Sequence, residues 1–196
     1  MNLHINSLIN QYCNKTKKCV SFELSPNESP YYDVNDIENE ELQFRPEYVD
    51  LCAESAQKIW KRCNFSNELI VLYEDKYSCH HKKEKEFIEN CLEPVKCLVC
   101  HFEWNDDGEI YNGTRYIWNT DRINSERLFR KIILSDISED TELDCAVYII
   151  DNQTKNLFFL YDDRGVDVYS NNEKFIQRMK SYSNLKAGCE SDRIPK

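Results

Sequence analysis

Glycine and proline are scarce in this sequence, which has four glycines and five prolines among its 196 residues. A low content of glycine and proline argues against a long flexible linker. It also argues against phosphate-binding loops, because these loops need several glycines. The P-loop, dinucleotide-binding, zinc-protease and nucleophile-elbow patterns are all missing from the sequence. We therefore expect no catalytic residues and no cofactor.

Long apolar runs are lacking as well. No stretch approaches the ~20 residues of a membrane-spanning helix. The opening residues, MNLHINSLINQYC, have neither the basic start nor the continuous apolar core of a secretory signal. We therefore expect a cytoplasmic protein with no membrane partner. A reducing compartment keeps thiols reduced, so most of the ten cysteines are interpreted as small core hydrophobes rather than as a disulfide framework.

Positive charge is in short supply, and the net charge is -10. This balance argues against nucleic acid as a direct partner. Three segments carry the excess. Residues 23–44 hold seven acidic residues and residues 132–154 hold six, both without lysine or arginine, while residues 103–109 hold four. Acidic proteins usually mix the two signs along the chain, so these segments are candidates for a surface that faces something positive.

Hydrophobic periodicity predicts an α+β fold with a mixed, largely antiparallel sheet, a C-terminal three-strand meander and flanking helices. The predicted strands are 18–24, 67–75, 95–104, 109–118, 144–150, 156–161 and 166–170. The segment NDDG at 105–108 predicts a turn after which 109–118 returns along 95–104. The predicted helices are 2–12, one that begins at Pro46, 81–92, one that Asn124 caps, and one that begins at a capping box of Ser170 and Glu173. We expect one domain over 1–190, with a weak division near residue 90 and a loose tail at 191–196.

The helix that begins at Pro46 has an apolar stripe at helical spacing, which predicts its buried face. The stripe consists of Tyr48, Leu51, Cys52, Ala56, Ile59, Trp60 and Cys63.

A cluster of cysteines and histidines between residues 79 and 101 is the strongest metal-like pattern. It comprises Cys79, His80, His81, Cys91, Cys97, Cys100 and His101. Zinc sites place C-x2-C on a tight turn, whereas Cys97 and Cys100 fall within a predicted strand, where residues three apart point to opposite faces. Cys100 and His101 are adjacent in that strand and diverge, which disfavours a catalytic pair. We interpret the cysteines as apolar side chains that a strand contributes to the hydrophobic core. A small metal protein or enzyme that uses this cluster remains the alternative.

The segment YDDRG at 161–165 places Asp162, Asp163, Arg164 and Gly165 together. These residues could form an acid–base or metal set. Aspartate starts turns readily and Gly165 can adopt a positive φ, so we favour a structural turn between the last two strands, with Arg164 paired to a carboxylate.

The same segment, followed at once by VDV and a closing helix, resembles the C-terminal signature of an uncharacterised bacterial domain-of-unknown-function family. FEL at 22–24 and ELIVLYED at 68–75 are similar too, and the likeness covers most of the chain. The family implies a fold more than an activity. A small acidic chain of this kind also resembles the immunity proteins of contact-dependent growth inhibition, which bind toxin domains and block their active sites.

This second resemblance implies an antitoxin that neutralises a cationic toxin domain as a 1:1 heterodimer, the toxin being a ribonuclease that acts on tRNA. Carboxylates suit such a partner, and aromatic side chains are the usual energetic anchors of an interface. The predicted partner-binding residues are Tyr31, Tyr32, Asp33, Asp36, Glu38, Glu40, Glu41, Glu103, Trp104, Asp106, Asp107 and Glu109. The region 136–144 is a third candidate.

Overall fold

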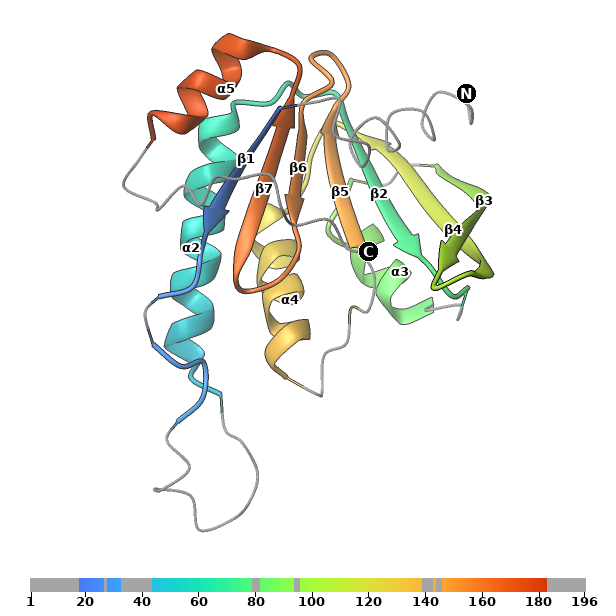
Figure 1. Cartoon of the computed structure of the whole chain (residues 1–196), viewed down its shortest axis with the longest axis horizontal. Coiled ribbons are helices and arrows are strands. Elements are labelled where there is room, and N and C mark those ends of the chain that lie inside the picture. The colour runs from blue at the N-terminus through green and yellow to red at the C-terminus, as the bar shows by residue number, and fades with distance from the viewer. Residues whose placement is uncertain are drawn as a thin grey trace.

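The fold is built on a seven-stranded sheet with the strand order β1-β7-β6-β5-β2-β4-β3 (Figure 1). The computed structural model describes residues 18–26, 28–32, 44–78, 82–93, 96–138, 143 and 146–182. Its strands are β1 (Lys18–Glu23), β2 (Leu69–Asp75), β3 (Cys97–Asp106), β4 (Glu109–Thr120), β5 (Ala146–Asp151), β6 (Leu157–Leu160) and β7 (Gly165–Ser170). Neighbouring strands all pair antiparallel, and β5, β6 and β7 form the predicted meander.

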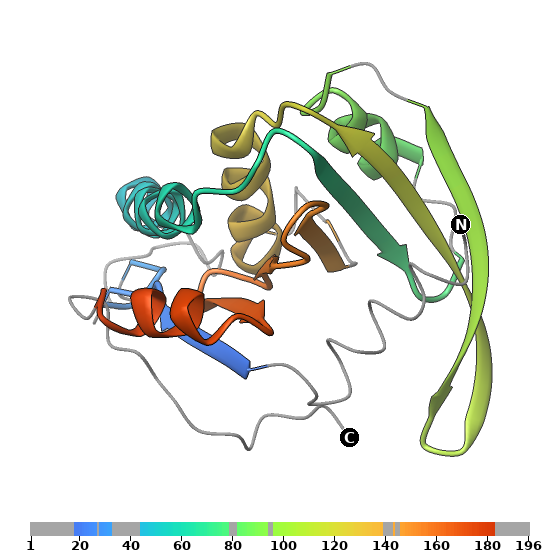
Figure 2. The same cartoon turned by 90° about the horizontal axis from the view of Figure 1, so that it is seen from above.

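Four helices flank this sheet among the described residues: α2 (Pro46–Cys63), α3 (Lys82–Glu89), α4 (Ser125–Ile137) and α5 (Glu173–Lys180). Helices α2 and α4 pack side by side and enclose the main core together with one face of the sheet (Figure 2). Helix α5 lies against the edge formed by β1 and β7. The α+β fold class is confirmed. The predicted helix at 2–12 and the tail at 191–196 lie outside the described residues.

The start of α2 follows the sequence expectation, but its buried face is rotated from the predicted stripe. Pro46 stands at the start of the helix, where its missing N–H costs nothing, and Asn64 ends it in the left-handed region at φ 51°. Leu51 is 50% exposed, whereas Val49 and Ala53 are buried. The prediction for Leu51 was wrong because α2 contacts both the sheet and α4, so a wider and shifted arc of its surface is covered.

Asparagine side chains cap the two later helices. Asn124 accepts a hydrogen bond from the backbone N–H of Arg127, as predicted for α4. For α5 the predicted capping box of Ser170 was wrong. Asn172 is the N-cap and accepts from two backbone N–H groups, while the Ser170 hydroxyl accepts from the N–H of Asn172. Asn172 stands two residues after Ser170 and its side chain accepts the capping hydrogen bonds instead, so Asn172 and not Ser170 is the N-cap of α5.

Two apolar clusters lie on opposite faces of the sheet. In the main cluster the Trp60 ring meets Phe129 and Phe158 edge-on, and these two rings stack at 5.1 Å. The second cluster comprises Ile70, Leu72, Cys100, Ile117, Ile150 and Leu157. Strand β2 is buried along its whole length and pairs with both β4 and β5, so strands from both sides of residue 90 share one sheet. Across the described helices, none combines the length and apolarity needed to cross a membrane.

Candidate functional site

The hairpin of β3 and β4 brings most of the second predicted binding segment together. Its ladder runs over ten opposed pairs, from Cys97 with Trp118 to Asp106 with Glu109. Asp107 and Gly108 form the connection and both have positive φ, 48° and 93°. Two central residues with positive φ define the type I′ turn that matches strand twist, and Asn105 Oδ1 accepts from the Gly108 N–H at 3.1 Å. The predicted turn at 105–108 is therefore confirmed.

An aromatic cluster lies on one face of this hairpin. Trp104 and Tyr111 are opposite one another in the ladder and stack with ring centroids 5.2 Å apart. Tyr77, from the turn that follows β2, meets both rings edge-on at 5.2 and 5.6 Å and remains 55% exposed. The indole N–H of Trp104 donates to the backbone oxygen of Lys76 at 2.9 Å. These contacts hold three large rings at the surface in a fixed arrangement.

Carboxylates lie on both faces of this hairpin: Glu109 is on the face of the rings, whereas Glu103, the neighbour of Trp104 in β3, points to the opposite face. Glu103, Asp107 and Glu109 are exposed, and Glu109 accepts a hydrogen bond from the Tyr111 hydroxyl at 2.6 Å. One cation lies close by, since the Lys76 ammonium is 5.1 Å from the centroid of the Trp104 ring. Ile110, at 70% exposure, adds an apolar side chain to the hairpin surface. Asp106 ends β3 and is paired with Glu109 in the ladder.

The hairpin is fastened to the sheet by a buried ion pair. Arg115 on β4 and Glu74 on β2 are direct neighbours, and the Arg115 Nε and Nη2 atoms lie 2.6 and 2.5 Å from Glu74 Oε1. The guanidinium also covers the Phe102 ring at 3.9 Å. The extended hairpin is thus anchored where β3 and β4 reach the end of β2.

The first predicted segment lies elsewhere. Residues 28–32 pass beside the start of α2, on the opposite side of the molecule from the β3–β4 turn in both Figure 1 and Figure 2. Tyr31 is half-buried and its hydroxyl donates to the backbone oxygen of Ile137, while the Arg45 guanidinium covers the Tyr32 ring at 5.3 Å. Five of the predicted carboxylates lie outside the described residues, namely Asp33, Asp36, Glu38, Glu40 and Glu41. Tyr31 has a packing role, and the described residues 28–32 do not form one surface with the β3–β4 hairpin.

The cysteines of β3 are placed as expected from strand geometry. Cys97 packs against the main core and Cys100 belongs to the cluster on the other face. Burial raises the pKa of the Cys100 thiol, which disfavours the thiolate form that a nucleophile needs. His101 is exposed, with Nδ1 3.2 Å from the Thr114 hydroxyl. Cys79, His80 and His81 lie outside the described residues.

The segment at 161–165 connects β6 to β7, so the predicted turn is confirmed, as is the pairing of Arg164 with a carboxylate. The Asp162 carboxylate accepts from the backbone N–H and the guanidinium of Arg164. The positive φ predicted for Gly165 was wrong, because the glycine begins β7 in extended backbone and is needed for space. A Cβ placed there would lie 2.0 Å from the Tyr161 hydroxyl oxygen and 2.9 Å from the backbone oxygen of Phe22.

Three carboxyl groups meet at this turn, which the sequence did not indicate. Asp162 and Asp163 are buried, and both come within 4.8 Å of Asp136, an exposed residue in the last turn of α4 whose carboxyl is only partly covered by protein. The Tyr48 hydroxyl of α2 donates to Asp163 Oδ2 at 2.5 Å. Partial burial, a hydrogen bond with Asp163 and the charges of Asp162 and Asp163 raise the pKa of Asp136 to about 6, against the opposing effect of Arg164.

Replacing Asp136 by asparagine is expected to stabilise the fold near neutral pH. A carboxyl whose pKa is raised on folding binds more protons in the folded than in the unfolded chain, so the stability of the wild type falls as pH rises from about 4 to about 6. At pH 7.5 the variant should melt about 2–4 °C higher, a solvent-screened gain of roughly 1 kcal/mol, and at pH 4 the two should melt together. Thermal melts from pH 4 to 8 measure this, and a pH-independent difference would contradict it.

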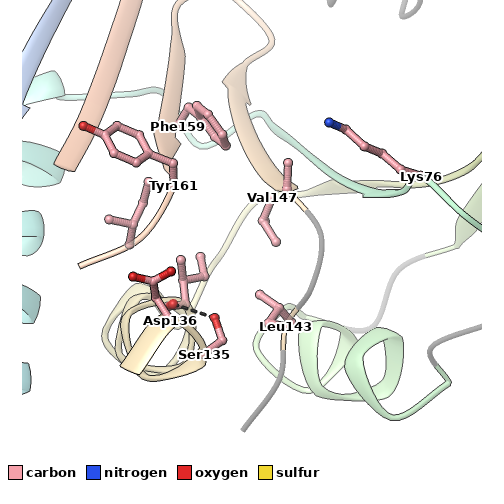
Figure 3. Close-up of a pocket in the computed structure, with 10 residues that line it drawn as sticks. Lys76, Ser135, Asp136, Leu143, Val147, Phe159 and Tyr161 are labelled. Atoms are coloured by element: carbon pink, nitrogen blue, oxygen red, sulfur yellow. Dashed lines mark hydrogen bonds between the residues drawn. The ribbon is translucent and has the colours of Figure 1, made fainter. Parts of the chain in front are cut away.

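A cavity of about 380 Å³ lies beside Asp136, between the end of α4 and strands β5 and β6 (Figure 3). Its lining combines polar groups with apolar side chains, which include Leu143, Val147 and Phe159. The polar residues are Lys76, Ser135, Asp136 and Tyr161. In Figure 3 the side chains of Asp136 and Lys76 lie on opposite sides of the cavity. Asp136 and Leu143 belong to the third predicted region, 136–144.

The described part of the chain thus defines an antiparallel α+β protein that presents a rigid hairpin of aromatic and acidic side chains. The chain belongs to the family of the domain of unknown function DUF3885, whose model matches residues 6–184. This match confirms the likeness to an uncharacterised domain family. No curated protein and no solved structure matches the chain.

Proposed function

We propose that this chain is a cytoplasmic immunity protein that binds a basic toxin domain and blocks its active site. The aromatic and acidic face of the β3–β4 hairpin is the contact surface in this proposal. The narrower assignment, a ribonuclease toxin of contact-dependent growth inhibition that acts on tRNA, rests on the analogy between a small acidic chain and such immunity proteins.

The surface cluster of the exposed Tyr77 with the half-buried Trp104 and Tyr111 is the observation that carries the proposal. Tryptophan and tyrosine dominate the energetics of protein interfaces, because they bury a large area with few rotatable bonds. Here the rings are already fixed by stacking and by the bond from the Trp104 indole to the Lys76 backbone. A preorganised surface loses less conformational entropy when it binds.

The charge around these rings favours a basic partner. Glu109 is exposed on the face of the rings, Asp107 is exposed in the turn and Glu103 is exposed on the other face of the hairpin, with Lys76 as the nearby counter-charge. Carboxylates on the rim of an interface mainly accelerate encounter with a cationic protein and determine which partners are rejected. A toxin that binds RNA phosphates has the complementary charge.

The proposal implies that a basic toxin domain is encoded beside this chain's gene. The test compares binding of the hairpin variants to that domain in a catalytically inactive form. Trp104→Ala should raise the dissociation constant about tenfold, mainly through faster dissociation. Neutralising Glu103, Asp107 and Glu109 to their amides should slow association several-fold at low salt and flatten its salt dependence. Stopped-flow measurements at two ionic strengths provide both rates.

Matched variants separate a specific surface from a general charge effect. Glu47, Glu54 and Glu126, which are exposed on α2 and α4, can be changed to glutamine for the same loss of three charges, and this variant should bind nearly as the wild type does. Neutralising Asp33, Asp36, Glu38, Glu40 and Glu41 tests the other predicted surface. If the two three-residue variants bind alike and Trp104→Ala has no effect, the hairpin is not the binding surface. Absence of binding at micromolar concentrations would overturn the proposed function itself.

A further inference from the structure

The cavity beside Asp136 has the size and lining of a small-ligand site. Its volume of about 380 Å³ falls within the usual range for ligand pockets, roughly 300–1,000 Å³. The apolar part of its lining consists of Ile132, Leu143, Ala146, Val147, Phe159 and Leu160. The Ser135 hydroxyl donates to the backbone oxygen of Ile132 at 2.7 Å, so this donor is used within α4. An apolar stem fits such walls.

The charge at one side of the cavity is negative. Asp136 lines the cavity, and its carboxyl lies within 4.8 Å of those of Asp162 and Asp163. The Arg164 guanidinium binds Asp162, with Nε 2.6 Å from Oδ2. Asp163 has a neutral partner, the Tyr48 hydroxyl. Among the described residues, the Asp136 side of the cavity therefore has three carboxyl groups and one cation, the Arg164 guanidinium. Lys76 lies on the other side of the cavity.

We propose that this cavity binds an organic cation, a primary amine carried on an unbranched apolar stem, with the amine at Asp136 and the stem along Val147, Phe159 and Leu160. The amine supplies the positive charge that the Asp136 side lacks, and the stem buries its methylene groups against the apolar walls. This inference is independent of the hairpin surface.

Other ligand classes fit the cavity less well. A bare divalent cation needs several oxygen ligands at once, and the carboxylates of Asp136, Asp162 and Asp163 are close enough to supply three. Two of them are already engaged, because Asp162 binds the Arg164 guanidinium and Asp163 accepts a hydrogen bond from the Tyr48 hydroxyl. An anion would face the carboxyls of Asp136, Asp162 and Asp163. A neutral apolar molecule would remove water from Asp136 without replacing its hydrogen bonds, which costs free energy.

Protonation of Asp136 gives the site a characteristic pH dependence. The charged or titratable groups around it are Asp162, Asp163 and Arg164 from the β6–β7 turn, Tyr48 from α2, Tyr161 after β6 and Lys76 after β2. Since the pKa of Asp136 is about 6, its ionised fraction falls about tenfold between pH 7 and pH 5. The bound amine favours the ionised form, so affinity should fall by about the same factor.

Titration of the full chain with three probes of equal length tests the proposal: hexylamine, hexanoate and hexanol. Chemical shifts or binding heats should show saturable binding of hexylamine in the millimolar range, about tenfold weaker at pH 5 than at pH 7. Hexanoate and hexanol should not saturate. Asp136→Asn should weaken hexylamine binding at least tenfold, whereas Glu126→Gln, which removes an exposed charge from the first turn of the same helix, should leave it unchanged.

The same amine can come from a free metabolite or from a lysine side chain, and Nα-acetyl-lysine methylamide distinguishes them. Binding of both hexylamine and this lysine derivative indicates that a protein side chain can enter, whereas binding of hexylamine alone indicates a free amine. Equal binding of hexanoate and hexylamine would overturn the proposal, as would unchanged affinity in Asp136→Asn or no saturable binding of hexylamine. A thermal melt of Asp136→Asn confirms that the variant is folded.

Discussion

Glu74→Gln should be among the most destabilising single changes in this protein, lowering the free energy of unfolding by about 3–5 kcal/mol. Glu74 and Arg115 are almost fully buried, and two guanidinium nitrogens of Arg115 lie within 2.6 Å of one carboxylate oxygen. The amide keeps the shape of Glu74 but removes the negative charge that the two guanidinium nitrogens contact. Thermal unfolding measures the effect, and the hairpin should lose amide-exchange protection first, because Arg115 joins it to β2.

An exposed ion pair provides the matched control. Arg122 and Glu93 are 2.9 Å apart, with side chains 76% and 46% exposed. Glu93→Gln removes the same charge in water and should cost less than about 1 kcal/mol. If Glu74→Gln and Glu93→Gln had similar costs, the pair at the base of the hairpin would not hold it to the sheet. Replacing Glu74 and Arg115 together by leucine and methionine should restore much of the stability lost in Glu74→Gln.

Gly165→Ala is expected to destabilise the fold by about 1–3 kcal/mol through overpacking. The added Cβ would overlap the Tyr161 hydroxyl and come within 2.9 Å of the Phe22 backbone oxygen. A side chain can move away, but Phe22 lies in β1, whose ladder with β7 includes the pair of Glu23 with Gly165. Chemical denaturation should show a lower midpoint with little change in slope.

A double-mutant cycle with Tyr161→Ala identifies the clashing group. If the Tyr161 ring causes part of the strain, Gly165→Ala should cost less in the Tyr161→Ala background than in the wild type. An equal cost in both backgrounds would assign the strain to the β1 backbone alone. A neutral Gly165→Ala would contradict the close approach itself.

Periodicity and turn chemistry predicted most of the local structure. The alternation in residues 95–104 and 109–118 around NDDG predicted the β3–β4 hairpin, because two strands and a tight turn are encoded within one short segment. The same reasoning correctly placed Cys97 and Cys100 on opposite faces of the sheet. It also put Glu103 and Trp104 on one hairpin with Asp107 and Glu109, although it missed Tyr77, which joins them from the far end of β2.

Properties that depend on distant contacts were not predictable in this way. Asp136 and Asp163 come from a helix end and a turn, and nothing in either segment indicates that the other is near. Leu51 has the spacing of a buried residue, but the position of α4 decides which arc of α2 is covered. The need for glycine at 165 was expected to be conformational, whereas it comes from Phe22 and Tyr161, and the first of these is far away in the sequence.

The pairing of β1 with β7 has a consequence for synthesis on the ribosome. Lys18 is paired with Ser170 in the ladder, so β1 can form its backbone hydrogen bonds with β7 only after about 150 further residues have been synthesised. At roughly 5–20 residues per second this interval lasts about 8–30 s, during which β1 has no neighbour in the sheet. Strands β2, β4 and β5 can pair as soon as they emerge, whereas β1 cannot pair until β7 has been made. A nascent chain arrested before β7 should therefore expose the alternating apolar face of Val20 and Phe22, and chaperones that bind extended apolar segments would recognise it there.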